Sequence, residues 1–174
     1  MNILIVEDND EKRNAIINAI KDKCSNAIIR WFNNYEDSAR FIEDNKGYIN
    51  LLLLDWCFPQ TSYSQTPVYG AGRLLLKRIK ALGLEIKTII ISSDPVNVDK
   101  EEYPFVEDSV RILSEDSIDD DAQTPLDLSE RVIAFRKPNV SLDPNIQIIS
   151  KNPVKSKKNG YHRRKSSTPW WMQN

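Results

Sequence analysis

Residues 51–59 read Leu-Leu-Leu-Leu-Asp-Trp-Cys-Phe-Pro, a short apolar run that ends on a carboxylate. Three further apolar runs also end beside polar or charged side chains: residues 1–6 before Glu7 and Asp8, residues 88–91 before Ser92, and residues 132–135 before Arg136 and Lys137. Short runs of this kind are typical of strands buried on both faces of a parallel sheet. Because ligands bind at the carboxyl ends of parallel strands, the sequence predicts one site along this edge of the sheet.

Segments with helical spacing alternate with the apolar runs. Apolar residues three and four apart predict helices near residues 10–22, 35–45, 71–82 and 104–113. The corresponding strands are expected at residues 2–6, 27–32, 50–55, 87–92 and 131–136. Strands that alternate with helices in this way favour a doubly wound α/β fold with right-handed connections.

The order of these motifs resembles the receiver domain of two-component response regulators. The resemblance rests on the acidic pair after the first strand, residues 55–59 after the third, Ser92 after the fourth, Lys137-Pro138 after the fifth, and a helix that follows Gly72. It implies a flavodoxin-like, five-stranded parallel sheet of order 2-1-3-4-5 within residues 1–150. The chain would then be an atypical stand-alone member of that family.

Three departures from the family pattern are expected to change the outline of the fold. Residues 60–71 and 99–130 are interpreted as insertions, and the second extends the connection between the fourth and fifth strands. The last helix is predicted to be weak or missing, because Pro144 and Pro153 leave little room for it. Ala134 stands where the family's switch aromatic is expected and Phe135 should face the opposite way, so the usual output route is in question.

The resemblance also assigns roles at the predicted site. Asp55 would accept a phosphoryl group as an acyl phosphate. An Mg²⁺ ion, which prefers oxygen ligands, would be held by Asp8, Asp55, the backbone carbonyl of Cys57 and, directly or through water, Glu7. Ser92 and Lys137 would contact the phosphoryl oxygens. Each residue also has a plainer interpretation: Asp55 and Ser92 as turn residues, the acidic pair as favourable charges at a helix start, and Lys137 as a solvated lysine.

Composition limits where the protein acts. The two cysteines have neither disulfide nor metal-site spacing and suit a reducing compartment. No apolar run approaches membrane-spanning length, and the first charged residue, Glu7, comes before a signal peptide's apolar stretch could form. We therefore expect a cytoplasmic protein that does not interact with membranes.

The charge of the chain is strongly segregated. Residues 99–130 contain twelve Asp or Glu, whereas residues 151–174 contain seven Lys or Arg and no acid. The basic tail also carries Tyr161, Trp170 and Trp171. Basic residues beside aromatic ones can bind nucleic acid, but a solvated, disordered tail or one that folds back on the acidic segment is equally compatible with the sequence.

These observations together predict a single-domain response regulator. It would receive a phosphoryl group on Asp55 from a histidine kinase or phosphotransfer protein and signal by binding a downstream protein. It would not be an enzyme beyond self-catalysed phosphoryl transfer and autodephosphorylation. The alternatives are a phosphorylation-independent pseudo-receiver that acts as a protein-interaction module, and a nucleic-acid-binding accessory protein that acts through residues 151–174.

Overall fold

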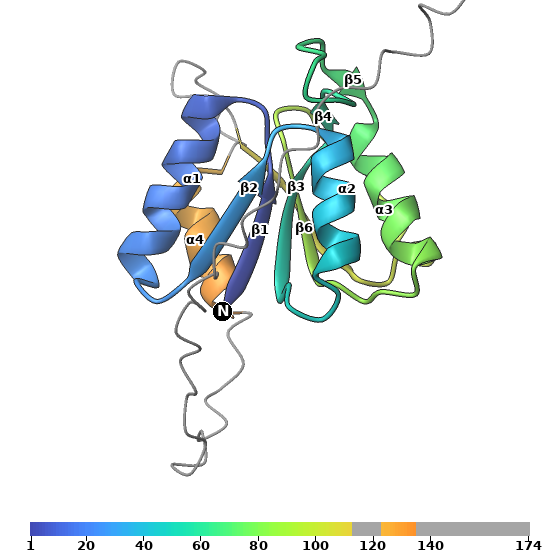
Figure 1. The fold of residues 1–174 in the computed structure, drawn as a ribbon. Helices are drawn as coiled ribbons and strands as arrows, with labels where there is room; N and C mark the ends of the chain where they lie inside the picture. Colours follow the sequence, from blue (N-terminus) through green and yellow to red (C-terminus); the bar gives the residue numbers. More distant parts are fainter. Residues whose placement is uncertain (113–122, 135–174) are drawn as a thin grey trace, which may run out of the picture. The chain divides into compact units, whose positions relative to one another are not determined.

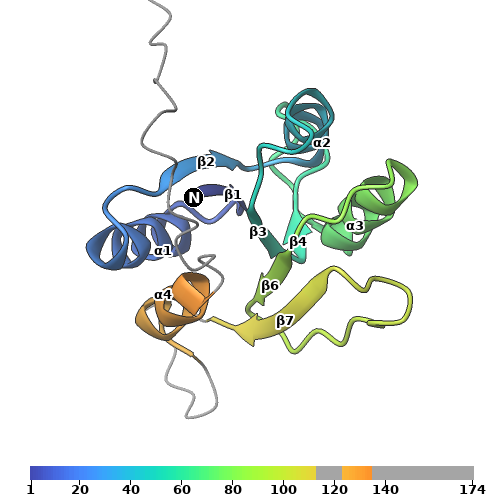
Figure 2. The same ribbon diagram turned by 90° about the horizontal axis from the view of Figure 1, so that it is seen from below.

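The computed structural model describes residues 1–112 and 123–134. Its main feature is a five-stranded parallel sheet of order β2-β1-β3-β6-β7 (Figure 1, Figure 2). The strands are β1 (Asn2–Val6), β2 (Ile28–Phe32), β3 (Leu51–Asp55), β6 (Thr88–Ser92) and β7 (Val106–Arg111). This order confirms the predicted doubly wound sheet.

Two helices cover each face of the sheet (Figure 2). On one face α1 (Asp10–Lys23) and α4 (Pro125–Ala134) pack against the odd-numbered side chains of β1 and β3. On the other, α2 (Tyr35–Asp44) and α3 (Ala71–Ala81) pack against the even-numbered ones. Alternate side chains of a strand point to opposite faces, so each central strand contributes to both cores. The predicted helices near residues 10–22, 35–45 and 71–82 are confirmed to within a residue.

Strand register brings the carboxyl ends of the central strands to one level. Val6 of β1 pairs with Leu54 of β3, so Glu7 and Asp55, the residues that follow this pair, reach the same edge of the sheet. Asp55 in turn pairs with Ile91 of β6, immediately before Ser92. Every residue of β3 and β6 is buried, which explains their continuous apolar sequence.

The predicted fifth strand at residues 131–136 is wrong. Residues 125–134 form helix α4, and the fifth strand is β7, which pairs with β6 in parallel. Its residues Val106 and Val110, followed by Ile112, are buried at a spacing of two or four, which suits a strand. A short apolar run such as residues 132–135 does not by itself distinguish a strand from a helix. Residues 135 and 136 lie outside the described part of the chain.

The predicted helix over residues 104–113 is wrong for the same reason, because this segment supplies β7. Residues 93–105, all of which the structure describes, connect β6 to β7 without a helix. Tyr103 and Phe105 from this connection are buried against the same core as α2 and α3 and cover the sheet in place of a helix. The connection is therefore shorter than predicted, and much of the acidic segment follows the fifth strand.

The last described helix, α4, lies earlier in the sequence than the weak closing helix that was considered between Pro144 and Pro153. That predicted element and the basic tail at 151–174 lie outside the described residues. Among the residues described, no helix has both the length and the apolar character needed to cross a membrane.

Residues 60–71, interpreted as an insertion, include part of a small β-hairpin. Strand β4 (Cys57–Phe58) pairs antiparallel with β5 (Val68–Tyr69), directly after the Asp55 end of β3 (Figure 1). Phe58 is fully buried and anchors the hairpin in the core. The hairpin therefore stands beside the edge where the central strands end.

Candidate metal and phosphoacceptor site

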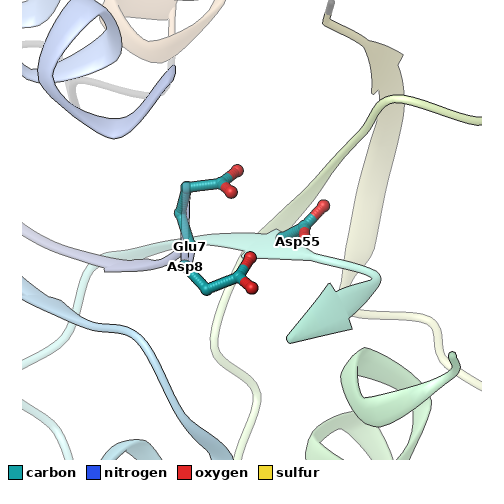
Figure 3. Close-up of side chains that lie close together, drawn as sticks. All are labelled: Glu7, Asp8 and Asp55. Carbon is teal, nitrogen blue, oxygen red and sulfur yellow. The ribbon is translucent and has the colours of Figure 1, made fainter. Parts of the chain in front are cut away.

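Three carboxylates meet where β1 and β3 end. Glu7 and Asp8 follow β1, and Asp55 is the last residue of β3 (Figure 3). One carboxylate oxygen from each residue lies within 4.8 Å of the others, a spacing that one cation can bridge. The structure thus brings together the three acidic residues that the sequence predicted as metal ligands.

These carboxylates line a pocket of about 370 Å³. The pocket is also lined by Asn9, Lys12, Cys57, Pro67, Ser92, Ser93 and Asp94. Ser92 is almost fully buried, and its Oγ accepts a hydrogen bond of 3.3 Å from the Asp94 backbone N–H. The backbone N–H of Cys57 donates to Asp55 Oδ2 at 3.3 Å, which helps to orient the carboxylate. Ser92 and Cys57 therefore lie in the predicted pocket.

Lys137, the cation predicted at the end of the fifth strand, lies outside the described residues. The described fifth strand ends instead on Arg111, which pairs in register with Ser92. Arg111 Nε donates to the Ser93 carbonyl at 3.1 Å, beside the pocket. Sequence reasoning missed Arg111 because it assigned this segment to a helix. The period-two spacing of Val106, Val110 and Ile112 was the available signal.

A second cation, Lys12, lies inside the carboxylate cluster and was also missed. Its Nζ is 2.7 Å from Glu7 Oε2 and 3.4 Å from Asp55 Oδ1, and only 4 % of its side chain is exposed. Lys12 belongs to the first turn of α1, whose N-cap Asn9 accepts a hydrogen bond from the Lys12 backbone N–H. A lysine in a first helical turn opposes the helix dipole, and this local anomaly was the only sequence signal.

The charges of the cluster are set by burial and by Lys12. Burial raises the pKa of Glu7 to about 7, against the opposing effect of the Lys12 ammonium. Burial likewise raises the pKa of Asp8 and of Asp55 above their ordinary values. Burial alone would lower the pKa of Lys12, but the charges of Glu7 and Asp55 outweigh it and raise that pKa. Among the described residues, the Lys12 ammonium therefore supplies positive charge that balances these acids.

Gly72 holds α3 close to the end of β3. Its N–H donates to the Trp56 carbonyl at 3.2 Å. A Cβ built at this position would lie 2.5 Å from the backbone oxygen of Asp55, closer than side chains approach backbone atoms. Glycine is therefore required here by a close approach of two backbones.

Comparison with known proteins agrees with the fold described above, a doubly wound α/β domain. No family model and no curated protein matches the chain. Among solved structures, the Mn²⁺-bound form of response regulator Rcp1 aligns with a TM-score of 0.57 and 17% identity over 79% of this chain and 96% of that one.

Two further solved structures align at similar levels. A DNA-binding response regulator of the LuxR family from Staphylococcus aureus gives a TM-score of 0.53 and 21% identity over 77% of this chain and 97% of its own. The phosphorylated cyanobacterial phytochrome response regulator RcpA gives a TM-score of 0.52 and 19% identity over 76% of this chain and 89% of its own. The chain therefore has the receiver-domain fold.

Proposed function

We propose that this protein is a response-regulator receiver that accepts a phosphoryl group on Asp55. The observation that carries the proposal is the position of Asp55: it ends β3 inside a pocket, with carboxylate oxygens of Glu7 and Asp8 within 4.8 Å. A carboxylate at such a position can act as a nucleophile toward phosphorus when nearby positive charge offsets the repulsion between anions.

The residues of this cluster fit a divalent cation. Hard cations such as Mg²⁺ take oxygen ligands, and Glu7, Asp8 and Asp55 offer three carboxylates at bridging distance. The carbonyl of Cys57 is the fourth protein ligand that we propose. Such an ion, when bound, would neutralise charge on the phosphoryl oxygens. The structurally similar Rcp1 was solved with Mn²⁺ and RcpA in a phosphorylated form, which supports the same chemistry here.

The groups of the chain itself have separable tasks in the transfer. An Asp55 carboxylate oxygen forms the new bond to phosphorus while the donor's bond to phosphorus breaks, and the leaving group keeps the electron pair. The Cys57 N–H, already bonded to Asp55 Oδ2, orients the attacking carboxylate. The Ser92 hydroxyl would turn from its present backbone partner to donate to a phosphoryl oxygen. Arg111, in register with Ser92, is our candidate for the cation that the family resemblance assigned to Lys137.

The proposed partners follow from this role. A histidine kinase or phosphotransfer protein would supply the phosphoryl group, and a downstream protein would read the result in the cytoplasm. The protein would carry out no catalysis beyond its own phosphorylation and dephosphorylation. Binding of nucleic acid through residues 151–174 stays a prediction, because that segment lies outside the described residues.

Phosphorylation with a small-molecule donor tests the proposal. The full chain is incubated with Mg²⁺ and acetyl phosphate, and its intact mass is measured. We expect an added mass of one phosphoryl group that is absent without Mg²⁺ and absent in Asp55→Asn. Asp22→Asn, at the far end of α1, is the matched control and should still be modified. An adduct that persists in Asp55→Asn would contradict the assignment of the acceptor.

One observation favours a second candidate function. Because Lys12 already balances Glu7 and Asp55, the cluster is stabilised without a metal. A phosphorylation-independent pseudo-receiver, acting only as a protein-interaction module, would be built in this way. The same experiment separates the two candidates: failure to form an adduct with any small phosphodonor at saturating Mg²⁺ would favour the pseudo-receiver.

A further inference from the structure

We propose that Lys12 is an internal counterion that competes with a divalent metal ion for the carboxylates of Glu7 and Asp55. The proposal rests on the metal site of the proposed function and adds a residue that controls its occupancy. In this protein, metal binding would require Lys12 to leave the cluster.

The positions of the atoms carry the argument. Lys12 Nζ lies between Glu7 Oε2 and Asp55 Oδ1, at 2.7 and 3.4 Å. Both residues belong to the group of three whose oxygens one cation can bridge. A metal ion that bound the same two oxygens, at about 2.1 Å from each, would occupy the space of the ammonium group. The two cations would also repel each other, and the repulsion is strengthened because Lys12, Glu7 and Asp55 are largely buried.

The setting of Lys12 makes this contact a built feature of the site. The residue is anchored by the first turn of α1, where its backbone N–H bonds to Asn9, and its side chain is almost completely buried. Asn9 also donates its own N–H to Glu7 Oε1 at 3.1 Å, so one turn of chain positions both members of the ion pair. Lysine is disfavoured in a first helical turn, and the cluster of acids offsets that local cost.

Displacement of Lys12 is nevertheless feasible, because the residue lines the pocket through which a metal ion would enter. The flexible stem of lysine can withdraw along that pocket without moving α1. The competition therefore lowers the affinity for metal without removing the metal ligands. Only a metal concentration high enough to displace the ammonium would open the site for phosphoryl transfer.

Titration with the metal alone tests this inference. Binding of Mn²⁺ to the full chain is measured from the electron paramagnetic resonance signal of the free ion, with no phosphodonor present. We expect Lys12→Met to bind Mn²⁺ about tenfold or more tightly than the wild-type chain, a change equal to about 1.4 kcal/mol. Lys12→Arg keeps the positive charge and should bind no tighter than wild type. Lys21→Met, which removes an exposed lysine from the last turn of α1, is the matched control.

The outcomes separate this inference from the proposed function. If Lys12→Met and Lys12→Gln both fold and bind Mn²⁺ no tighter than wild type, the competition is overturned, whether or not Asp55 is phosphorylated. Tighter binding in these variants without any phosphoryl adduct on Asp55 would support the competition and overturn the proposed function instead.

Loss of folding is covered by a second measurement. Removing Lys12 leaves buried carboxylates without their partner, so a variant can lose its native far-ultraviolet circular dichroism in the absence of metal. Recovery of the native spectrum on addition of Mn²⁺ would show that the ion replaces the ammonium. Failure of Mn²⁺ to restore either variant would overturn the proposal.

Discussion

Glu7, Lys12 and Gly72 are single residues whose properties depend on the atoms that the fold places around them. Glu7 and Lys12 are both buried charges, and each has its main partner in the other. Breaking a buried pair from one side leaves the remaining charge without compensation, which is costly. Gly72 is different, because it acts through absence of a side chain: the space its Cβ would need is filled by the backbone oxygen of Asp55. These residues determine how the acceptor carboxylate is presented.

We predict that Gly72→Ala destabilises the protein. The new Cβ would overlap Asp55 O, and overpacking costs about 1–3 kcal/mol. Because the overlapped atom belongs to the backbone, we expect a cost in the upper part of that range, above the gain of about 1 kcal/mol from alanine's helix propensity. Urea denaturation measures the change. Lys77→Ala, on the exposed side of the same helix, is the control and should stay within about 0.5 kcal/mol of wild type. Equal or greater stability of Gly72→Ala would show that α3 does not approach β3 this closely.

Among the elements, β7 and α4 depend most on tertiary contacts for their secondary structure. Val110 and Ile112 of the β7 segment pack in the same core as Leu128 and Val132 of α4. An ion pair between Asp108 of β7 and Arg131 of α4 joins the two elements directly. The start of α4 is marked locally: Thr124 and Asp127 cap it reciprocally, with the Asp127 N–H donating to Thr124 Oγ1 and the Thr124 N–H to Asp127 Oδ2.

This cap supplies a prediction for the element. Thr124→Ala should destabilise the protein by about 1 kcal/mol, because the first turn of α4 loses the oxygen that accepts from Asp127 N–H. Thr124→Ser retains that oxygen and should be close to wild type. Thermal denaturation of the two variants checks the difference. If both substitutions were neutral, residues 125–134 would not begin a helix at this point.

For the whole molecule, the buried carboxyls make stability depend on pH in an unusual direction. Glu7 has a pKa near 4.5 when exposed and about 7 in the folded protein. Between these values the folded chain holds a proton that the unfolded chain has released, so stability falls as pH rises through this window. Asp8 and Asp55 have pKa values raised in the same direction and reinforce the effect.

We therefore predict that the metal-free protein is less stable at about pH 8 than at about pH 5, and that Glu7→Gln reduces this difference. Urea midpoints measured in a chelating buffer over this range give the comparison. Added Mn²⁺ should restore stability mainly at the higher pH, because metal ligands must be deprotonated to bind. The change in urea midpoint from pH 5 to pH 8 is compared between the two proteins. If the midpoint of the wild type rises, and rises by more than the midpoint of Glu7→Gln, the raised pKa of Glu7 is contradicted.

Much of the fold and four members of the site follow from local patterns in the sequence. Strands β1, β3 and β6 each contain three or four consecutive apolar residues, and Glu7, Asp8, Asp55 and Ser92 stand directly where these runs end. In a parallel sheet the carboxyl ends of neighbouring strands lie together. Residues that directly follow these strands in the sequence could therefore be predicted to lie close to one another in space.

Tertiary contacts alone decided the rest. Residues 106–111 and 125–134 each carry a pattern that suits both a strand and a helix. Residues 106–111 form a strand because they pair with the edge of β6. Residues 125–134 form a helix because they pack in the same core as α1. The position of Lys12 in a first helical turn is unusual, but its buried contacts with Glu7 and Asp55 exist only in the folded chain. Local sequence determines what a segment can form, whereas burial against distant partners determines which form it takes and which charges meet.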